Sequence, residues 1–106
     1  MQERINAITS VLDTNKGENI EVYDLREKDY FVDQVVIVSS MGERHTEALL
    51  DFLKKDLKGK EQFLNTQKSS EWIVVDLGDI LIHLMTPLYR ERYHMEEFLN
   101  EIGPMH

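Results

Sequence analysis

The side chains best suited to chemistry gather in one short stretch, where Asp76, Asp79 and His83 follow one another closely. Carboxylates and imidazoles are ligands that divalent metals accept. The two carboxylates, however, are three residues apart around a glycine, and the histidines of the chain never show the His-x-x-x-His spacing of a helical metal site. Carboxylate–histidine pairs are also common core contacts. We therefore expect neither a metal nor another cofactor here.

Nucleophilic catalysis is disfavoured as well. The chain has no cysteine, which removes thiolate nucleophiles, thiolate metal sites and disulfides together. Ser39 and Ser40 lack the Gly-x-Ser-x-Gly elbow that exposes a nucleophilic serine. Ser40 and Glu43 instead match a capping box at a helix start. We interpret the chain as a binding protein and not as an enzyme.

The stretch around Asp76 and His83 has the pattern of a β-hairpin. Residues 72–77 and 80–85 are apolar strands around Gly78-Asp79, a glycine-first pair suited to a type II′ turn. Because a two-residue turn fixes the register, each side chain can be assigned to a face. One face is aliphatic and must be core: Ile73, Val75, Leu77, Ile80, Ile82 and Leu84. The other is mixed and pairs Trp72 with Met85, Val74 with His83, and Asp76 with Leu81.

Two interpretations of the mixed face stay open. In the first, a helix covers it, His83 and Asp76 satisfy each other, and Trp72 packs in the core. In the second, part of the face is open and offers Trp72, Leu77 and Asp79 to a partner. Aromatic side chains ringed by acids make good anchors for a basic protein surface.

Other elements must hold this hairpin in place. Apolar spacing predicts a helix over residues 2–13, a strand at 20–23, a strand buried on both faces at 35–38 and a helix after Ser40. That second helix should bury a stripe of Leu49, Phe52, Leu53 and Leu57, with Leu50 at its edge. Residues 58–70 are polar and predict a loop or a short strand.

A last helix should follow Thr86 as N-cap, with Pro87 in its first turn. Its buried side should comprise Leu88, Met95, Leu99 and Ile102, and Gly103-Pro104 should end it. The length of 106 residues predicts one domain over residues 1–106, and the helices that separate its strands indicate the fold class. We expect an α/β sandwich of two or three layers, with a mixed sheet and flanking helices.

The charge is acidic and uneven. The net charge is −8, and residues 71–106 hold seven acidic side chains against two arginines. This balance disfavours direct nucleic-acid binding, which needs clustered Lys and Arg, and favours a basic partner. The alternative is that the acidic side chains serve only to keep the protein soluble. No apolar run approaches the ~20 residues of a membrane span, and no secretory segment is evident, so we expect a cytoplasmic protein.

Residues 71–83 read Glu-Trp-Ile-Val-Val-Asp-Leu-Gly-Asp-Ile-Leu-Ile-His, which closely resembles the signature of the Iojap family, the ribosomal silencing factors called RsfS. Downstream, Pro87, Arg90, Tyr93 and Glu96 match the family's Pro-x-x-Arg-x-x-Tyr-x-x-Glu spacing. Upstream, Asp33 and the pair Arg44-His45 also match. The resemblance is strong over residues 71–96 and weaker over 19–99.

The resemblance implies a nucleotidyltransferase-like fold without that enzymatic activity. It also implies binding to the large ribosomal subunit through its fourteenth protein, a small basic component. Family members there obstruct joining of the small subunit, which lowers translation when nutrients are short, and they are often homodimers when free. The docking surface implied for this chain comprises Trp72, Asp76, Leu77, Gly78, Asp79, Arg90 and Tyr93.

Two other functions remain as alternatives to ribosome binding. A nucleotide-dependent enzyme would need two carboxylates one residue apart and a glycine-rich phosphate loop, whereas Gly42 is the only glycine at the candidate loop. A dimeric adaptor with a non-ribosomal partner is a further possibility. Arg90 and Tyr93 fit either an ion pair with Asp76 or Asp79, or direct partner contact.

The chain also departs from the family pattern at four places. Asp33-Gln34-Val35 stands where the family usually has Asp-Tyr-Phe. Ser40-Met41-Gly42 stands where the family has Gly-Thr-Ser, and the family's Gly-x-Glu-Gly element before the hairpin is missing. Leu99 stands where the family usually has a closing tryptophan.

Overall fold

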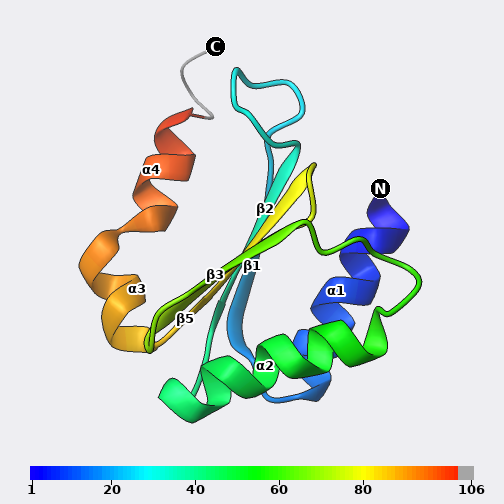
Figure 1. Cartoon of the computed structure of the whole chain (residues 1–106). Coiled ribbons are helices and arrows are strands. Elements are labelled where there is room, and N and C mark those ends of the chain that lie inside the picture. Colours follow the sequence, from blue (N-terminus) through cyan, green and yellow to red (C-terminus); the bar gives the residue numbers. More distant parts are fainter. Residues whose placement is uncertain (103–106) are drawn as a thin grey trace.

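The computed structural model describes the backbone of residues 1–102 and the side chains of residues 1–99. One five-stranded sheet runs through it in the order β1-β2-β5-β4-β3 (Figure 1). Only β2 and β5 pair in parallel, and the other neighbours are antiparallel, so the predicted mixed sheet is confirmed. The strands are β1 (Glu18–Asp24), β2 (Gln34–Ser39), β3 (Asn65–Lys68), β4 (Trp72–Asp76) and β5 (Ile80–Met85).

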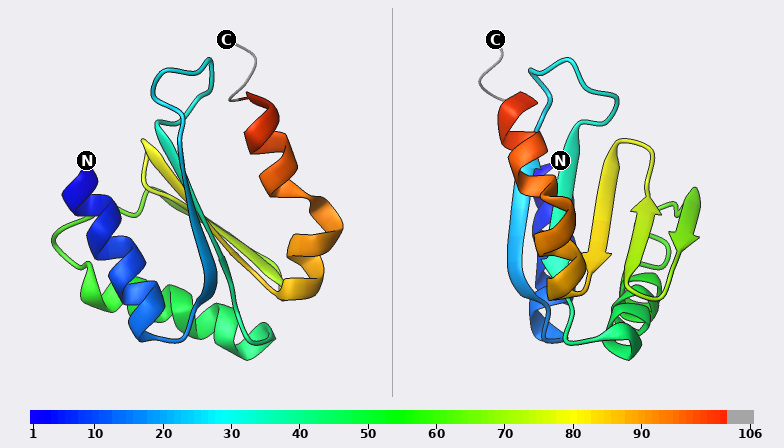
Figure 2. Two further views of the ribbon diagram at one scale, coloured as in Figure 1. Left: turned by 180° about the vertical axis from the view of Figure 1, so that it is seen from behind. Right: turned by 90° about the vertical axis from the view of Figure 1, so that its left-hand side faces the viewer.

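Helices cover the two faces of this sheet unequally. α1 (Gln2–Thr14) and α2 (Glu43–Asp56) lie on one face, and α3 (Pro87–Tyr93) and α4 (Met95–Ile102) lie on the other (Figure 1). The right-hand view of Figure 2 shows α3 and α4 in front of β1 and β2, while β4 and β3 are left uncovered on that side. The α/β sandwich therefore has three layers, and its third layer is incomplete. Its likeness to nucleotidyltransferases stays a prediction.

The hairpin has the predicted register. Trp72 pairs with Met85, Val74 with His83, and Asp76 with Leu81. The turn is closed by the Leu77 N–H, which donates to the Ile80 carbonyl at 3.0 Å. The aliphatic face packs against α1 and α2 with its six side chains buried: Ile73, Val75, Leu77, Ile80, Ile82 and Leu84. The interior assignment of this face is confirmed.

The start of α2 differs from the predicted capping box. The helix begins at Glu43 after Gly42, and no side chain caps it. Ser40 still belongs to the end of the sheet, because its N–H donates to the Met85 carbonyl. Its hydroxyl is consequently buried 2.6 Å from the Thr46 hydroxyl.

The buried stripe predicted for the second helix is confirmed at Leu49, Leu53 and Leu57 and differs at Phe52. Leu49, Leu50 and Leu53 are fully buried, whereas Phe52 is 37% exposed. α2 packs against both β4 and α1. Its apolar face is therefore wide enough to enclose Leu50, which the pattern placed only at the edge, and it excludes Phe52.

The last helix is in fact two helices. His94 adopts the left-handed conformation (φ 49°, ψ 43°) between α3 and α4, so one apolar stripe does not continue across it. Thr86 is the predicted N-cap and accepts from the Tyr89 N–H at 3.4 Å. Leu99 is buried as predicted, but Leu88 is 64% exposed and its assignment was wrong. The Ile102 side chain and Gly103-Pro104 lie outside the described residues.

The first prediction concerns the hairpin turn. Gly78 has φ +97°, and a Cβ there would lie 3.1 Å from a methyl group of Leu64. Gly78→Ala should lower the free energy of unfolding by about 1–3 kcal/mol through backbone strain, and the crowding should add to this loss. Urea unfolding measures the loss. Gly59→Ala is the matched control, since Gly59 has φ +80° and open space around it. An equal loss in both variants would contradict the role of the Leu64 contact.

Candidate protein-binding surface

The structure separates the seven docking residues into two groups at opposite ends of the hairpin. Trp72 begins β4, and Gly78 lies in the turn beyond its other end. Six residue steps along a strand span about 20 Å. The faces differ as well, because Trp72 belongs to the partly uncovered face and Leu77 is buried in the core below α1 and α2. A single continuous surface therefore does not contain all seven.

At the Trp72 end, the structure brings three rings together. The ring of Trp72 lies 5.1 Å from that of Tyr93 on α3 and 5.8 Å from that of His83, measured between centroids. Trp72 is half-buried and Tyr93 is 50% exposed. An open hollow of about 270 Å³ adjoins Trp72 and is lined by Gln67, Lys68, Ser69, Trp72 and Val74. This arrangement offers a fixed aromatic surface beside a space that a partner's side chain can enter.

His83 fixes the orientation of that tryptophan. The Trp72 Nε1–H donates to the His83 Nδ1 at 3.0 Å, so the imidazole accepts through Nδ1, is neutral and carries its proton on Nε2. Burial lowers the pKa of His83 to about 4. The contact between His83 and Asp76 that the first interpretation of the mixed face requires is not made. Asp76 Oδ1 instead accepts from the Gly78 N–H at 2.8 Å, because the turn backbone lies closer to this carboxylate.

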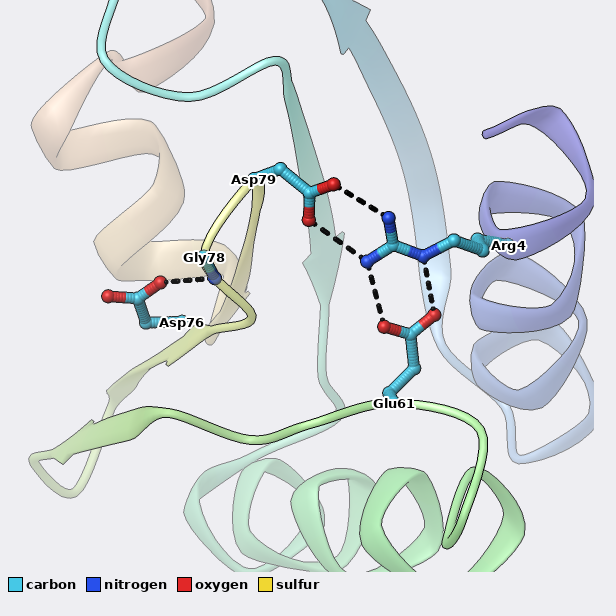
Figure 3. Close-up of polar contacts among 5 residues, drawn as sticks. All are labelled: Arg4, Glu61, Asp76, Gly78 and Asp79. Atoms are coloured by element: carbon cyan, nitrogen blue, oxygen red, sulfur yellow. Dashed lines mark hydrogen bonds and ion pairs between the residues drawn. The ribbon is translucent and has the colours of Figure 1, made fainter.

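At the turn end, the Asp79 carboxylate is held by Arg4 of α1 (Figure 3). Two guanidinium nitrogens donate to Asp79 at 2.7 and 2.9 Å, and two donate to Glu61 at 2.8 and 2.9 Å. These bonds raise the pKa of Arg4, and the Arg4 guanidinium holds the pKa of Asp79 below its ordinary value. The turn is thus tied to the first helix and to the segment after α2.

Arg90 does not lie on the surface around Trp72 but is buried beneath α3. It is 8% exposed, and its guanidinium donates to Glu96 at 2.6 Å, to the Asn19 carbonyl at 2.6 Å and to the Ser39 hydroxyl at 3.0 Å. An ion pair with Asp76 or Asp79 was the alternative, and it is wrong. Arg90 points instead toward β1 and β2, so it fixes α3 and α4 to the sheet.

In the pair Arg44-His45, the histidine makes structural contacts within the chain. His45 accepts from the Met41 N–H through Nδ1 at 2.8 Å, which leaves its Nε2–H to donate to the Asn15 carbonyl at 2.8 Å. His45 therefore joins the start of α2 to the end of α1. Arg44 is exposed in the first turn of α2.

The two carboxylates of the hairpin turn do not face a common point. Asp76 and Asp79 point away from each other across the turn (Figure 3). Within the described part of the chain, no three His, Cys, Asp or Glu side chains are grouped so that they could hold a metal ion. None of the helices in residues 1–102 is long and apolar enough to cross a membrane.

Comparison with known proteins agrees with the resemblance. The family model described as "Ribosomal silencing factor during starvation", RsfS, matches residues 1–104. The chain belongs to this family of ribosomal silencing factors. The RsfS protein of Haemophilus influenzae is 33% identical over 96 residues, which cover 88% of this chain and 94% of that protein. These names are those of a regulatory factor.

One mitochondrial and one chloroplast protein are also similar to this chain. The mouse protein named "Mitochondrial assembly of ribosomal large subunit protein 1" is 28% identical over 99 residues, covering 88% of this chain and 43% of that protein. The maize chloroplast protein Iojap is 26% identical over 94 residues, covering 85% of this chain and 40% of that protein.

Solved structures confirm the fold of the ribosomal silencing factor. A crystal structure from Chromobacterium violaceum superposes with a TM-score of 0.87 at 24% identity, covering 94% of this chain and 86% of that one. A second, from Bacillus halodurans, gives a TM-score of 0.81 at 21% identity, covering 92% and 94%.

A pH prediction follows from the buried imidazole. The unfolded chain should bind a proton at His83 near its ordinary pKa of 6.5, whereas the folded chain resists protonation until about 4. The free energy of unfolding should therefore fall as the pH drops from 6.5 to 4, by up to about 3 kcal/mol from this group. His83→Gln should remove that part of the pH dependence in urea unfolding. His94→Gln is the control at an exposed histidine, and a loss of slope there instead would contradict the assignment.

A second stability prediction concerns the Arg4 contacts. Arg4→Met should lower the free energy of unfolding by about 1–3 kcal/mol, because the largely buried Glu61 carboxylate would lose its partner. The Arg4–Asp79 pair should contribute fully to the free energy of unfolding at pH values above the unfolded Asp79 pKa of about 3.8. This contribution, and with it the effect of the substitution on Asp79, should vanish as the pH falls through the lower pKa of Asp79 in the folded chain. Urea unfolding at neutral and acidic pH measures both. Arg44→Met, at an exposed arginine, is the control, and an equal loss there would contradict the prediction.

Proposed function

We propose that this ribosomal silencing factor binds the large ribosomal subunit through its basic fourteenth protein and sterically blocks joining of the small subunit, which represses translation. Membership of the family supports the silencing role. The name of the mouse relative, which refers to assembly of a ribosomal large subunit, supports this subunit as the partner. We also propose that the free chain is a homodimer and that it acts in the cytoplasm.

The observation that carries this proposal is the contact between Trp72 and Tyr93 beside an open hollow. Aromatic side chains that are held rigidly lose little conformational entropy on binding, and they dominate the energetics of many interfaces. The exposed edge of Tyr93 and the uncovered strands β4 and β3 leave room for a protein surface to approach. Val74 and Asp76 extend the same face along β4.

The remaining docking residues act in support of this surface. Leu77 and Gly78 determine the shape of the turn, and Asp79 is bound to Arg4. Arg90 holds α3, so it places Tyr93 over Trp72. We therefore propose direct contact by Trp72, Tyr93 and Asp76, with Leu77, Gly78, Asp79 and Arg90 as positioning residues.

The acidic charge should assist the encounter. A net charge of −8 attracts a basic ribosomal protein, and such attraction acts mainly on the association rate. The inhibition itself requires no reaction. A bound protein of this size excludes the small subunit wherever their positions on the large subunit overlap.

The experiment is co-sedimentation with purified large subunits, followed by a subunit-joining assay. Tyr93→Ala should weaken binding by about tenfold or more, and Trp72→Ala should abolish it, because both remove the aromatic surface. Each variant should lose inhibition of subunit joining in proportion to its loss of binding.

Two controls keep this test specific. Phe52→Ala removes a comparably exposed aromatic ring from α2, on the other side of the sheet, and should bind normally. Circular dichroism must show that each variant is folded. Normal co-sedimentation of folded Trp72→Ala and Tyr93→Ala would refute the surface. Tight binding of the native chain without inhibition of joining would refute the steric mechanism alone.

A further inference from the structure

A second aromatic cluster lies away from the Trp72–Tyr93 surface. Tyr30, in the loop between β1 and β2, contacts both its neighbour Phe31 and Phe98 of α4, with ring centroids 4.7 Å apart for Tyr30–Phe31 and 6.2 Å for Tyr30–Phe98. Phe31 is 74% exposed and Phe98 is 49% exposed. Figures 1 and 2 show this loop beside α4, at the opposite end of the α3–α4 layer from α3. We call these three residues the loop aromatic cluster.

The exposure of Phe31 belongs to an ordered loop. Leu25 and Val32 on either side of it are buried at 3% and 4% exposure, and the Leu25 N–H donates to the Asp33 carbonyl at 2.8 Å. The Tyr30 N–H donates to the Lys28 carbonyl at 2.9 Å. These contacts close the loop and turn Phe31 outward. Two exposed rings on either side of the half-buried Tyr30 mark an interaction surface more than a single exposed apolar side chain does.

The surroundings of the cluster are acidic. Residues 24–33 contain four acidic side chains and two basic ones, and Glu97 precedes Phe98 on α4. One of the two basic residues, Arg26, is paired with Asp24 at 2.6 Å. Glu27, Asp29, Asp33 and Glu97 are all exposed. A partner at this cluster therefore meets apolar rings inside a negative rim.

We propose that the loop aromatic cluster docks a basic protein segment that carries an apolar side chain. Lysines or arginines of that segment would face the acidic rim while its apolar side chain contacts Phe31 and Phe98. A second copy of this chain fits less well, since a two-fold contact would place the same negative rims against each other. This inference does not rest on the proposed function, because Trp72 and Tyr93 take no part in it.

The test is a titration of the isotope-labelled chain, followed by NMR, with a short peptide of lysines and leucines in a glycine–serine background. Saturable shifts should be confined to amides near residues 28–33 and 95–99. A peptide with glutamates in place of the lysines should bind about tenfold more weakly or not at all, and added salt should weaken the lysine peptide. The double variant Phe31→Ser with Phe98→Ser should lose about tenfold or more in affinity.

The controls separate this cluster from general acidity and from the other surface. Phe52→Ser and Tyr93→Ser should leave the affinity unchanged. Three outcomes would overturn the inference: shifts spread over the whole acidic surface, shifts centred on Trp72, or equal binding of the glutamate peptide. Concentration-dependent self-association that Phe31→Ser abolishes would assign the cluster to a second copy of the chain.

Discussion

The hydrogen bond from the Leu77 N–H to the Ile80 carbonyl closes a two-residue turn, and this closure determines where each hairpin side chain lies. Because side chains alternate along a strand, a shift of one residue would exchange the two faces. With this register, the aliphatic face meets α1 and α2, and Trp72 stands beside His83 on the partly uncovered face. Both the stability of the core and the position of the aromatic anchor depend on the same turn.

The hairpin could be predicted from sequence because its information is local. A glycine-first turn and period-two apolar alternation occur within fourteen residues, and they give both register and burial. The contacts that support it could not be predicted in this way. Arg4 and Asp79 are 75 residues apart, and Arg90 and Asn19 are 71 apart. The one local hint for Arg4 is that it shares a helix side with the buried Ile8, four residues on.

Errors in the other elements have local causes that a periodic pattern does not encode. The left-handed His94 is not a glycine, so the pattern offered no reason to divide the last helix. Ser40 has the right residue type for a cap, but its backbone still bonds to β5 and its hydroxyl turns inward. The split of the docking residues follows from the geometry of an extended strand. Neighbouring residues of the signature lie on opposite faces, and residues six positions apart lie about 20 Å apart.

The distribution of ion pairs changes what the charge count means for binding. Asp79 and Glu96 lie in the acidic stretch 71–106 that the sequence suggests for a basic partner, yet Asp79 is bonded to Arg4 and Glu96 to Arg90. Their fields are therefore partly cancelled within the chain, whereas the exposed acids near Phe31 and Phe98 face solvent. A count of formal charges assigns the acidic attraction to residues 71–106 as a whole. In the folded structure Asp79 and Glu96 are bonded to arginines, whereas Glu27, Asp29 and Asp33 in the loop between β1 and β2 are exposed, so a basic segment would meet solvent-exposed acids at this loop.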